Sequence, residues 1–298
     1  MRKNHIAIIV ICAVFVVLLA TPLCFLFVTP SVNIVYNYQG KAYMQNTRSL
    51  FRYEIVLNEY SNISNVVPTS DGWYCCAEKD NINYILFVSK ENEVMQTLER
   101  PSFYGHIYDA FLYNDKYSIV CDCQDKENSS NETVILSADF SNKDLSCQKV
   151  PNKLGYYSIF ANGDVLYGSD GEKIYKYENG TPQEIAIGSP VVGITDSCLL
   201  YEYQSNIYQY NLITQEKSRC DFDMDLYSYR TLDFESLSND NNYIVGCKIG
   251  FFKDSNASEY ITHTTVLDME KNKEYIMLGS IGKVYENIQI VTDDLNIK

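Results

Sequence analysis

The sequence predicts an all-β fold, a β-propeller of about six blades, preceded by one N-terminal transmembrane helix. Three observations lead to this prediction. Strand-turn-strand patterns recur along the chain, the two chain ends carry complementary half-repeats, and an uncharged apolar stretch follows the first five residues. With 298 residues the chain is long enough for a single closed repeat body. Its 46% apolar residues, with 26 tyrosines, are enough to build a large core.

The first 28 residues predict a signal anchor. Residues 1–5 form a short basic head, and residues 6–28 contain no charge. A helix of that length measures about 35 Å and spans the hydrocarbon core of a bilayer. Because the cationic residues precede the helix, the positive-inside rule places residues 1–5 in the cytoplasm and the rest of the chain outside the cell membrane. A cleavable signal peptide is the alternative, but this apolar run is longer and offers no good cleavage site.

After the helix, the chain divides into a connection and a repeat domain. Residues 29–47 form either a polar stalk or a first strand with a connection, and residues 48–298 form the propeller domain. The clearest repeat consists of a strand at Asp164–Tyr167, a polar turn containing glycine and a second strand at Lys173–Tyr177. An Asn-Gly turn and a third strand at Glu184–Ile187 complete an antiparallel meander.

The same pattern returns in six hairpins, which cover residues 50–63, 84–98, 134–150, 174–187, 207–222 and 263–278. The last five each follow an apolar strand, and these strands cover residues 72–77, 117–121, 164–167, 197–201 and 243–247. A sixth such strand, residues 287–291, ends the repeats with no hairpin after it, whereas the first hairpin has no strand before it. A ring whose last blade is built from both chain ends explains this mismatch, since it leaves no sheet edge open. We therefore expect residues 288–291 and 53–56 to share one sheet.

Two alternatives to six blades remain open at this point. The hairpin spacing varies, so that five or seven blades also fit the pattern. A β-sandwich likewise contains many short strands, but it does not predict paired orphan ends.

Two repeats carry a more specific pattern. Val165-Leu-Tyr-Gly-Ser-Asp170 precedes Lys173-Ile-Tyr175, and Leu199-Leu-Tyr201 precedes Asn206-Ile-Tyr208. These segments resemble the extracellular β-propeller repeats of the low-density-lipoprotein-receptor type and related repeats of bacterial surface propellers. In those repeats an apolar-Tyr-Trp-Thr-Asp strand precedes an Ile-centred strand; here Trp73 is the only tryptophan, and the Thr-Asp pair is replaced by Ser-Asp. The resemblance implies six blades and a binding or scaffold role.

The charge of the chain restricts its partners. The formal net charge is −14 and the isoelectric point is about 4.6. Nucleic acid is not an expected partner, because binding a phosphate backbone requires clustered Lys and Arg. The expected partner is a protein, a peptide or an envelope glycan.

The ten cysteines are expected to be mostly reduced core thiols. Cys12 and Cys24 fall in the predicted helix. Six others lie in or beside the apolar strands, where a small hydrophobic residue packs well: Cys75, Cys76, Cys121, Cys123, Cys198 and Cys247. Cys147 and Cys220 fall in the last strands of blades that the repeat separates by one blade, too far apart for a disulfide. No cysteine or histidine cluster has zinc-site spacing, and no cofactor is expected.

One acidic segment is a weak calcium candidate. If the segment is a strand, Asp221, Asp223 and Asp225 present three carboxylates on one face. Leu226 and Leu232 stand where an EF-hand loop requires Gly and Glu, so solvated charge on a loop or sheet edge is the favoured interpretation.

No catalytic motif is present, and the chain is not expected to be an enzyme. The leading hypothesis is a membrane-anchored extracytoplasmic binding module that uses loops on one face of the ring. The first alternative is an extracytoplasmic hydrolase or lyase, in which Asp or Glu residues converge with His106 or His263 in a deep pocket. The second alternative is a structural subunit of a membrane complex.

Overall fold

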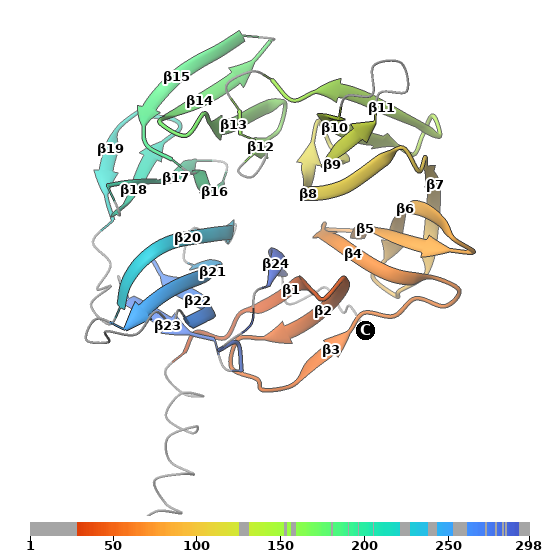
Figure 1. Ribbon diagram of the computed structural model, residues 1–298, viewed down its shortest axis with the longest axis horizontal. Helices are drawn as coiled ribbons and strands as arrows, with labels where there is room; N and C mark the ends of the chain where they lie inside the picture. The colour runs from red at the N-terminus through yellow and green to blue at the C-terminus, as the bar shows by residue number, and fades with distance from the viewer. Residues whose placement is uncertain are drawn as a thin grey trace, which may run out of the picture.

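The protein is an all-β, six-bladed propeller. The computed structural model describes residues 29–124, 131–151, 154–155, 159–179, 181–189, 191–195, 197–204, 206–220, 227–237, 243–252, 261–271, 273–277, 279–281, 283 and 285–291. These residues form six four-stranded antiparallel sheets, which stand around a common axis as blades (Figure 1).

In each blade the strands follow one another from the innermost to the outermost. Blade 1, the closing blade, contains β24 (Glu286–Val291), β1 (Asn33–Tyr38), β2 (Lys41–Asn46) and β3 (Arg52–Glu54). Blade 2 contains β4 (Ser61–Pro68), β5 (Gly72–Lys79), β6 (Ile82–Ser89) and β7 (Val94–Arg100). Blade 3 contains β8 (Tyr104–Tyr113), β9 (Lys116–Gln124), β10 (Asn131–Asp139) and β11 (Asp144–Lys149).

The other three blades follow in chain order. Blade 4 contains β12 (Phe160–Asn162), β13 (Val165–Ser169), β14 (Lys173–Glu178) and β15 (Thr181–Ile187). Blade 5 contains β16 (Val191–Ile194), β17 (Cys198–Tyr203), β18 (Asn206–Asn211) and β19 (Lys217–Arg219). Blade 6 contains β20 (Tyr227–Leu237), β21 (Tyr243–Phe252), β22 (Ile261–Asp268) and β23 (Lys273–Ile276).

The ring closes through strand β24. It pairs antiparallel with β1, with Ile290 opposite Ile34, and it lies beside that early strand in Figure 1. The innermost strands contact one another in the cyclic order β4, β8, β12, β16, β20, β24 and back to β4. Ile288 of β24 is fully buried. The predicted closure by both chain ends is therefore confirmed, since β24 and Tyr53 of β3 belong to one sheet.

Two details of the predicted repeat are wrong. The hairpin expected at residues 50–63 does not exist, because β3 is the outermost strand of blade 1 and β4 is the innermost strand of blade 2. The apolar residues Ile55 and Leu57 in the connection are buried in the core between these two blades, which gave the segment its strand-like pattern. Residues 287–291 occupy the innermost position, and β1 takes the second-strand position expected for them. Residues 29–47 thus supply two strands.

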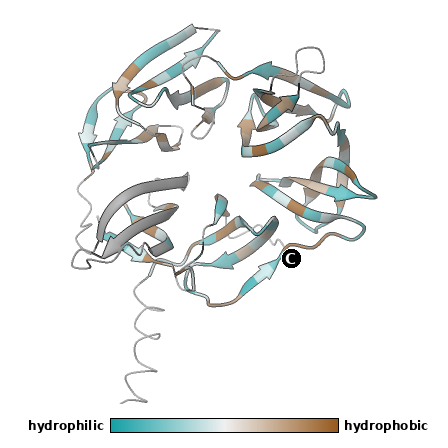
Figure 2. Ribbon diagram, in the orientation of Figure 1, coloured by the Kyte–Doolittle hydropathy of each residue, from teal (hydrophilic) through white to brown (hydrophobic). Residues whose placement is uncertain are grey.

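The core lies between neighbouring blades. One cluster fills the space between blades 1 and 2 and includes the fully buried Trp73. Apolar and polar residues alternate along many of the blade strands in Figure 2. Cys121 and Cys198 are buried free thiols, as expected for core cysteines, and burial raises the pKa of each to about 12. Cys147 lies in blade 3 and Cys220 follows the last strand of blade 5, so blade 4 separates them.

Two predicted features lie outside the described residues: the signal anchor at residues 6–28 and the calcium candidates Asp221, Asp223 and Asp225. Within the described residues, no helix is both long enough and apolar enough to cross a membrane. The same part of the chain contains no cluster of three or more His, Cys, Asp or Glu side chains that could hold a metal ion.

Candidate functional site

The inner hairpin turns of blades 3, 4 and 5 surround a cavity of about 330 Å³. The turns connect β8 to β9, β12 to β13 and β16 to β17, and each belongs to the innermost hairpin of its blade. Residues that line the cavity are Leu112, Asp115, Asn162, Gly163, Ile194 and Thr195. We call this space the inner-turn cavity.

Short turns with left-handed backbone build the rim of the inner-turn cavity. Asn114 and Asp115 have φ values of 52° and 57°, and they connect the paired residues Tyr113 and Lys116. Two consecutive positive φ angles are typical of the type I′ hairpin turn, which Asn and Asp tolerate better than most residues. Gly163 has a φ of 60° in the corresponding turn of blade 4.

Hydrogen bonds between neighbouring blades hold the three turns in place. The backbone N–H of Asn114 donates to the carbonyl of Gly163 at 2.9 Å. The Asn162 side-chain Nδ2 donates to the carbonyl of Thr195 at 3.1 Å. Blade 3 is thereby joined to blade 4, and blade 4 to blade 5. A ligand entering this cavity would meet a rim that is already ordered, which lowers the entropic cost of binding.

Among the described residues, the lining of the inner-turn cavity is polar and includes one carboxylate, that of Asp115. Asp115 is exposed at the rim, and within the described part of the chain its carboxylate makes no hydrogen bond or ion pair. Asn162 and Thr195 add an amide and a hydroxyl, while Leu112 and Ile194 add apolar surface. This combination suits a hydrogen-bonding ligand such as a peptide or a sugar.

A second cavity, of about 210 Å³, also borders the β8–β9 hairpin. Tyr113 and Lys116 contribute to its lining from the hairpin, and Ser146 and Gln148 contribute from β11. We call it the blade 3 cavity. The β8–β9 hairpin therefore contributes residues to the lining of two cavities.

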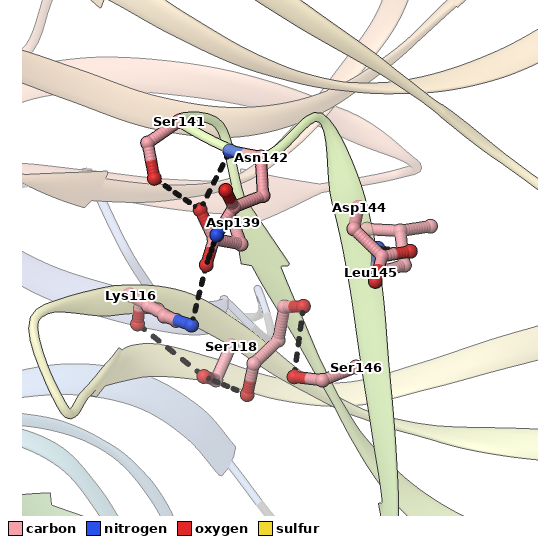
Figure 3. Close-up of polar contacts among 9 residues, drawn as sticks. Lys116, Ser118, Asp139, Ser141, Asn142, Asp144, Leu145 and Ser146 are labelled. Carbon is pink, nitrogen blue, oxygen red and sulfur yellow. Dashed lines mark hydrogen bonds and ion pairs between the residues drawn. The ribbon is translucent and has the colours of Figure 1, made fainter.

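The charge of Lys116 beside the blade 3 cavity is neutralised by Asp139 (Figure 3). Lys116 Nζ lies 2.7 Å from Asp139 Oδ2, and Ser141 Oγ donates to Oδ1 at 2.6 Å. The backbone and side-chain N–H groups of Asn142 donate to the same carboxylate. These donors, Lys116 first, hold the pKa of Asp139 well below its usual range. With this pair satisfied, the cavity presents mainly hydroxyl and amide groups.

The structure does not bring the two predicted histidines to either cavity. His106 lies exposed on β8, with its ring centroid 4.9 Å from that of Tyr108. His263 lies on β22 of blade 6, is 1% exposed and belongs to the buried interior. Neither lines the inner-turn cavity, which has Asp115 as its only carboxylate among the described residues.

Asp109 is an unusual carboxylate of the innermost strand β8. It follows an irregularity in the pairing of β8 with β9, between Ile107 and Asp109. The residue retains some exposed surface, but its carboxylate is withdrawn from water, and this burial raises its pKa to about 7. The N–H of Ala110 donates to Asp109 Oδ1 at 2.7 Å and opposes the shift.

The Ser-Asp pair of the receptor-like repeat has a turn-forming role. Asp170 follows β13, and its Oδ1 accepts hydrogen bonds from the N–H groups of Glu172 at 3.1 Å and Lys173 at 3.0 Å. Tyr175 Oη donates to Asp170 Oδ2 at 3.0 Å. The motif therefore shapes the β13–β14 hairpin and contributes nothing to the lining of the inner-turn cavity.

Sequence reasoning missed Asp115, Asn162 and Thr195. A signal for the first did exist, because Asn114-Asp115 stands between two apolar segments and is a typical hairpin turn. No pattern in the sequence shows that three such turns from successive blades meet around one cavity.

Comparisons with known proteins establish the fold alone. The sequence matches no protein-family profile and no curated protein. A protein of unknown function from Bacteroides caccae is similar in structure, with a TM-score of 0.53 and 11% identity over 89% of this chain and 100% of that one. An oligogalacturonate lyase from Vibrio parahaemolyticus (TM-score 0.48, 11% identity) matches over 83% of this chain and 79% of its own. An acylaminoacyl peptidase (TM-score 0.48, 12% identity) matches over 82% of this chain and 50% of its own. The class of protein is a six-bladed β-propeller.

Proposed function

We propose that the protein is a membrane-anchored, extracytoplasmic binding module that captures a peptide or sugar segment in the inner-turn cavity. The observation that carries the proposal is the polar rim made by turns of three successive blades, on which the Asp115 carboxylate has no partner among the described residues. The uncharged run at residues 6–28 supports the anchor. The resemblance of residues 165–170 to receptor-type propeller repeats supports a binding role by analogy.

A photo-crosslinking experiment on the full-length protein in its native membrane tests the proposal. A photoreactive phenylalanine analogue replaces Ile194, which lines the cavity. The control replaces Ile213, which is 76% exposed in the β18–β19 turn of blade 5. We expect a discrete covalent adduct at position 194 and none at position 213. Equal labelling at both positions, or none at either, would overturn the proposal.

A pair of charge-removing variants identifies the recognition chemistry. Asp115→Asn keeps the turn, because Asn accepts positive φ, but removes the charge at the rim. Asp80→Asn is the matched control, since Asp80 has a φ of 52° in the two-residue β5–β6 turn of blade 2. We expect Asp115→Asn to weaken capture by about tenfold, as loss of one hydrogen bond to a charged group does. Capture by Asp80→Asn should equal that of the wild type.

A carboxylate-dependent hydrolase or lyase is the second candidate function. The observation that favours it is Asp109, whose pKa of about 7 suits a proton donor or acceptor at neutral pH. Incubation of the protein with envelope glycan fragments and mass spectrometry of the products tests this candidate. Cleavage that Asp109→Asn abolishes would favour the enzyme, and unchanged fragments would exclude it for those substrates.

A further inference from the structure

The exposed apolar side chains of the propeller gather on one part of its outer edge. The described residues include nine large hydrophobic side chains that are mainly exposed. Four of them fall in the seven positions from 50 to 56, around the short edge strand β3. They are Leu50 (60% exposed), Phe51 (75%), Tyr53 (68%) and Val56 (61%).

A fifth exposed residue, Ile281, lies in the connection between β23 of blade 6 and β24 of blade 1. Ile281 is 65% exposed and follows the turn at Gly279. A Cβ placed on Gly279 would lie 3.5 Å from Leu50 Cδ2, which brings that turn against the start of the group. We call Leu50, Phe51, Tyr53, Val56 and Ile281 the rim patch. The other four exposed hydrophobic residues are spread over blades 2, 4 and 5. A gathered group of this kind usually marks an interaction surface.

The N-terminal end of the described chain lies next to the rim patch. Arg48 Nε donates to the carbonyl of Thr29. Thr47 Oγ1 donates to the carbonyl of Pro30 at 2.5 Å, and Val32 N–H donates to Thr47 Oγ1 at 3.0 Å. Thr29 is thus fixed beside Arg48, three positions before Phe51. Three residues span at most about 10 Å of extended chain.

Thr29 directly follows the uncharged run at residues 6–28 in the sequence. If the run crosses the bilayer, Thr29 leaves it at the interface, where the headgroup region is several ångströms deep. Side chains about 10 Å from the exit point reach that region. Aromatic residues such as Phe51 and Tyr53 favour the boundary between lipid and water.

We propose that the rim patch rests in the headgroup region of the membrane and fixes the propeller edge-on beside its anchor. The anchor alone leaves the propeller free to swing about Thr29, whereas a second apolar contact sets its orientation. The inference rests on the membrane anchor of the proposed function but is independent of the inner-turn cavity.

Fluorescence quenching by brominated lipid tests the inference on the full-length protein. The protein is reconstituted into vesicles of phosphatidylcholine and phosphatidylglycerol, brominated near the carbonyl end of the acyl chains. Phe51→Trp reports on the rim patch, and Ile213→Trp is the matched control on blade 5. The native Trp73 is fully buried and contributes the same background to both. Because both positions are exposed, neither substitution disturbs the core.

We expect brominated lipid to cause about a twofold loss of emission at position 51 and no change at position 213, since an interfacial group lies within several ångströms of the bromines. Tyr53→Trp should repeat the result. Flotation of the vesicles is measured on the same samples. Protein that floats without quenching at position 51 would overturn the rim-patch contact and leave the anchor intact. Protein that does not float would overturn both. Absence of quenching, together with dimers formed when a photoreactive phenylalanine analogue at position 51 is irradiated, would overturn the membrane contact. It would assign the patch to a second copy of the chain.

Discussion

Replacing Asn37 with alanine should destabilise the ring by about 2–4 kcal/mol, because Asn37 joins the closing blade to blade 2 inside the core. Asn37 lies on β1 and is 7% exposed, and Asn65 lies on β4 and is 4% exposed. Asn37 Nδ2 donates to Asn65 Oδ1 at 2.9 Å, and the Asn65 N–H donates to Asn37 Oδ1 at 3.1 Å. Tyr117 of blade 3 extends the contact, since its Oη donates to the Asn65 carbonyl at 2.8 Å.

The magnitude follows from the two hydrogen bonds that alanine removes. Each buried hydrogen bond contributes about 1 kcal/mol net, and each polar group left without that partner adds about 1 kcal/mol or more. The Tyr117→Phe variant removes the bond to Asn65 and the weaker contact of Tyr117 Oη with Cys76 Sγ at 3.4 Å, and it should cost about 1–2 kcal/mol. Asn206→Ala is the control, because among the described residues the side chain of Asn206 donates to the Gln204 carbonyl in an exposed turn. It should change stability by less than about 0.5 kcal/mol.

Urea unfolding followed by the emission of Trp73 measures all three variants. Trp73 is fully buried in blade 2, the blade that contains Asn65, so it reports directly on this part of the ring. We expect Asn37→Ala to lower the midpoint with an unchanged denaturant slope. A midpoint equal to that of Asn206→Ala would refute the view that this polar contact stabilises the junction of the three blades.

Three further predictions concern ring closure and titration. Ile288→Ala should lower the free energy of unfolding by about 2–5 kcal/mol, because it leaves a cavity at a fully buried site in the closing strand. In the same urea assay, Ile213→Ala at an exposed site should change the free energy of unfolding by less than about 0.5 kcal/mol. The raised pKa of Asp109 means that the folded protein binds more protons than the unfolded chain between pH about 4 and 7. Stability should therefore fall as the pH rises through that range, and Asp109→Asn should flatten the profile; an unchanged slope would contradict the assignment. The lowered pKa of Asp139 has the opposite effect on the pH dependence of stability. Its pairing with Lys116 therefore stabilises the fold above pH about 4. The Asp139→Asn variant should be less stable than the wild type at neutral pH, and this loss of stability should shrink as the pH falls below about 4. A loss of stability that does not depend on pH would exclude an electrostatic origin.

The second strands of several blades were predictable because they bury side chains on both faces between neighbours. Strands β5, β9 and β17 are largely apolar runs bounded by turn residues, and such runs are visible without any knowledge of the partner strand. The hairpins β6–β7, β10–β11, β14–β15, β18–β19 and β22–β23 were predicted from the polar turns that join their strands, although their outer strands are mainly exposed. Six blades followed from the number of repeats.

Apart from β24, the innermost strands were not predicted, and the pairing of four of them, β4, β8, β16 and β20, is irregular. Strand β4 has register shifts around Ser64, with Asn62 and Asn65 at φ values of 51° and 54°. Each register shift adds one residue to the strand, and the side chains after it point to the opposite faces of the sheet. Apolar residues therefore do not recur at every second position along the strand. A register shift of the same kind in β8, between Ile107 and Asp109, prevents the sequence pattern from showing where Asp109 lies.

Local patterns in the sequence are sufficient to predict the all-β repeat, the closure by both chain ends and the uncharged run before Thr29, because strand period, turn chemistry and hydrophobic length are properties of short segments. Only the folded ring shows that Asp115, Asn162 and Thr195 share one cavity and that Leu50 lies beside the turn at Gly279. These contacts join residues from different blades, and their proximity depends on the rotation between blades. That rotation is set by packing across the whole ring, so no local segment encodes it.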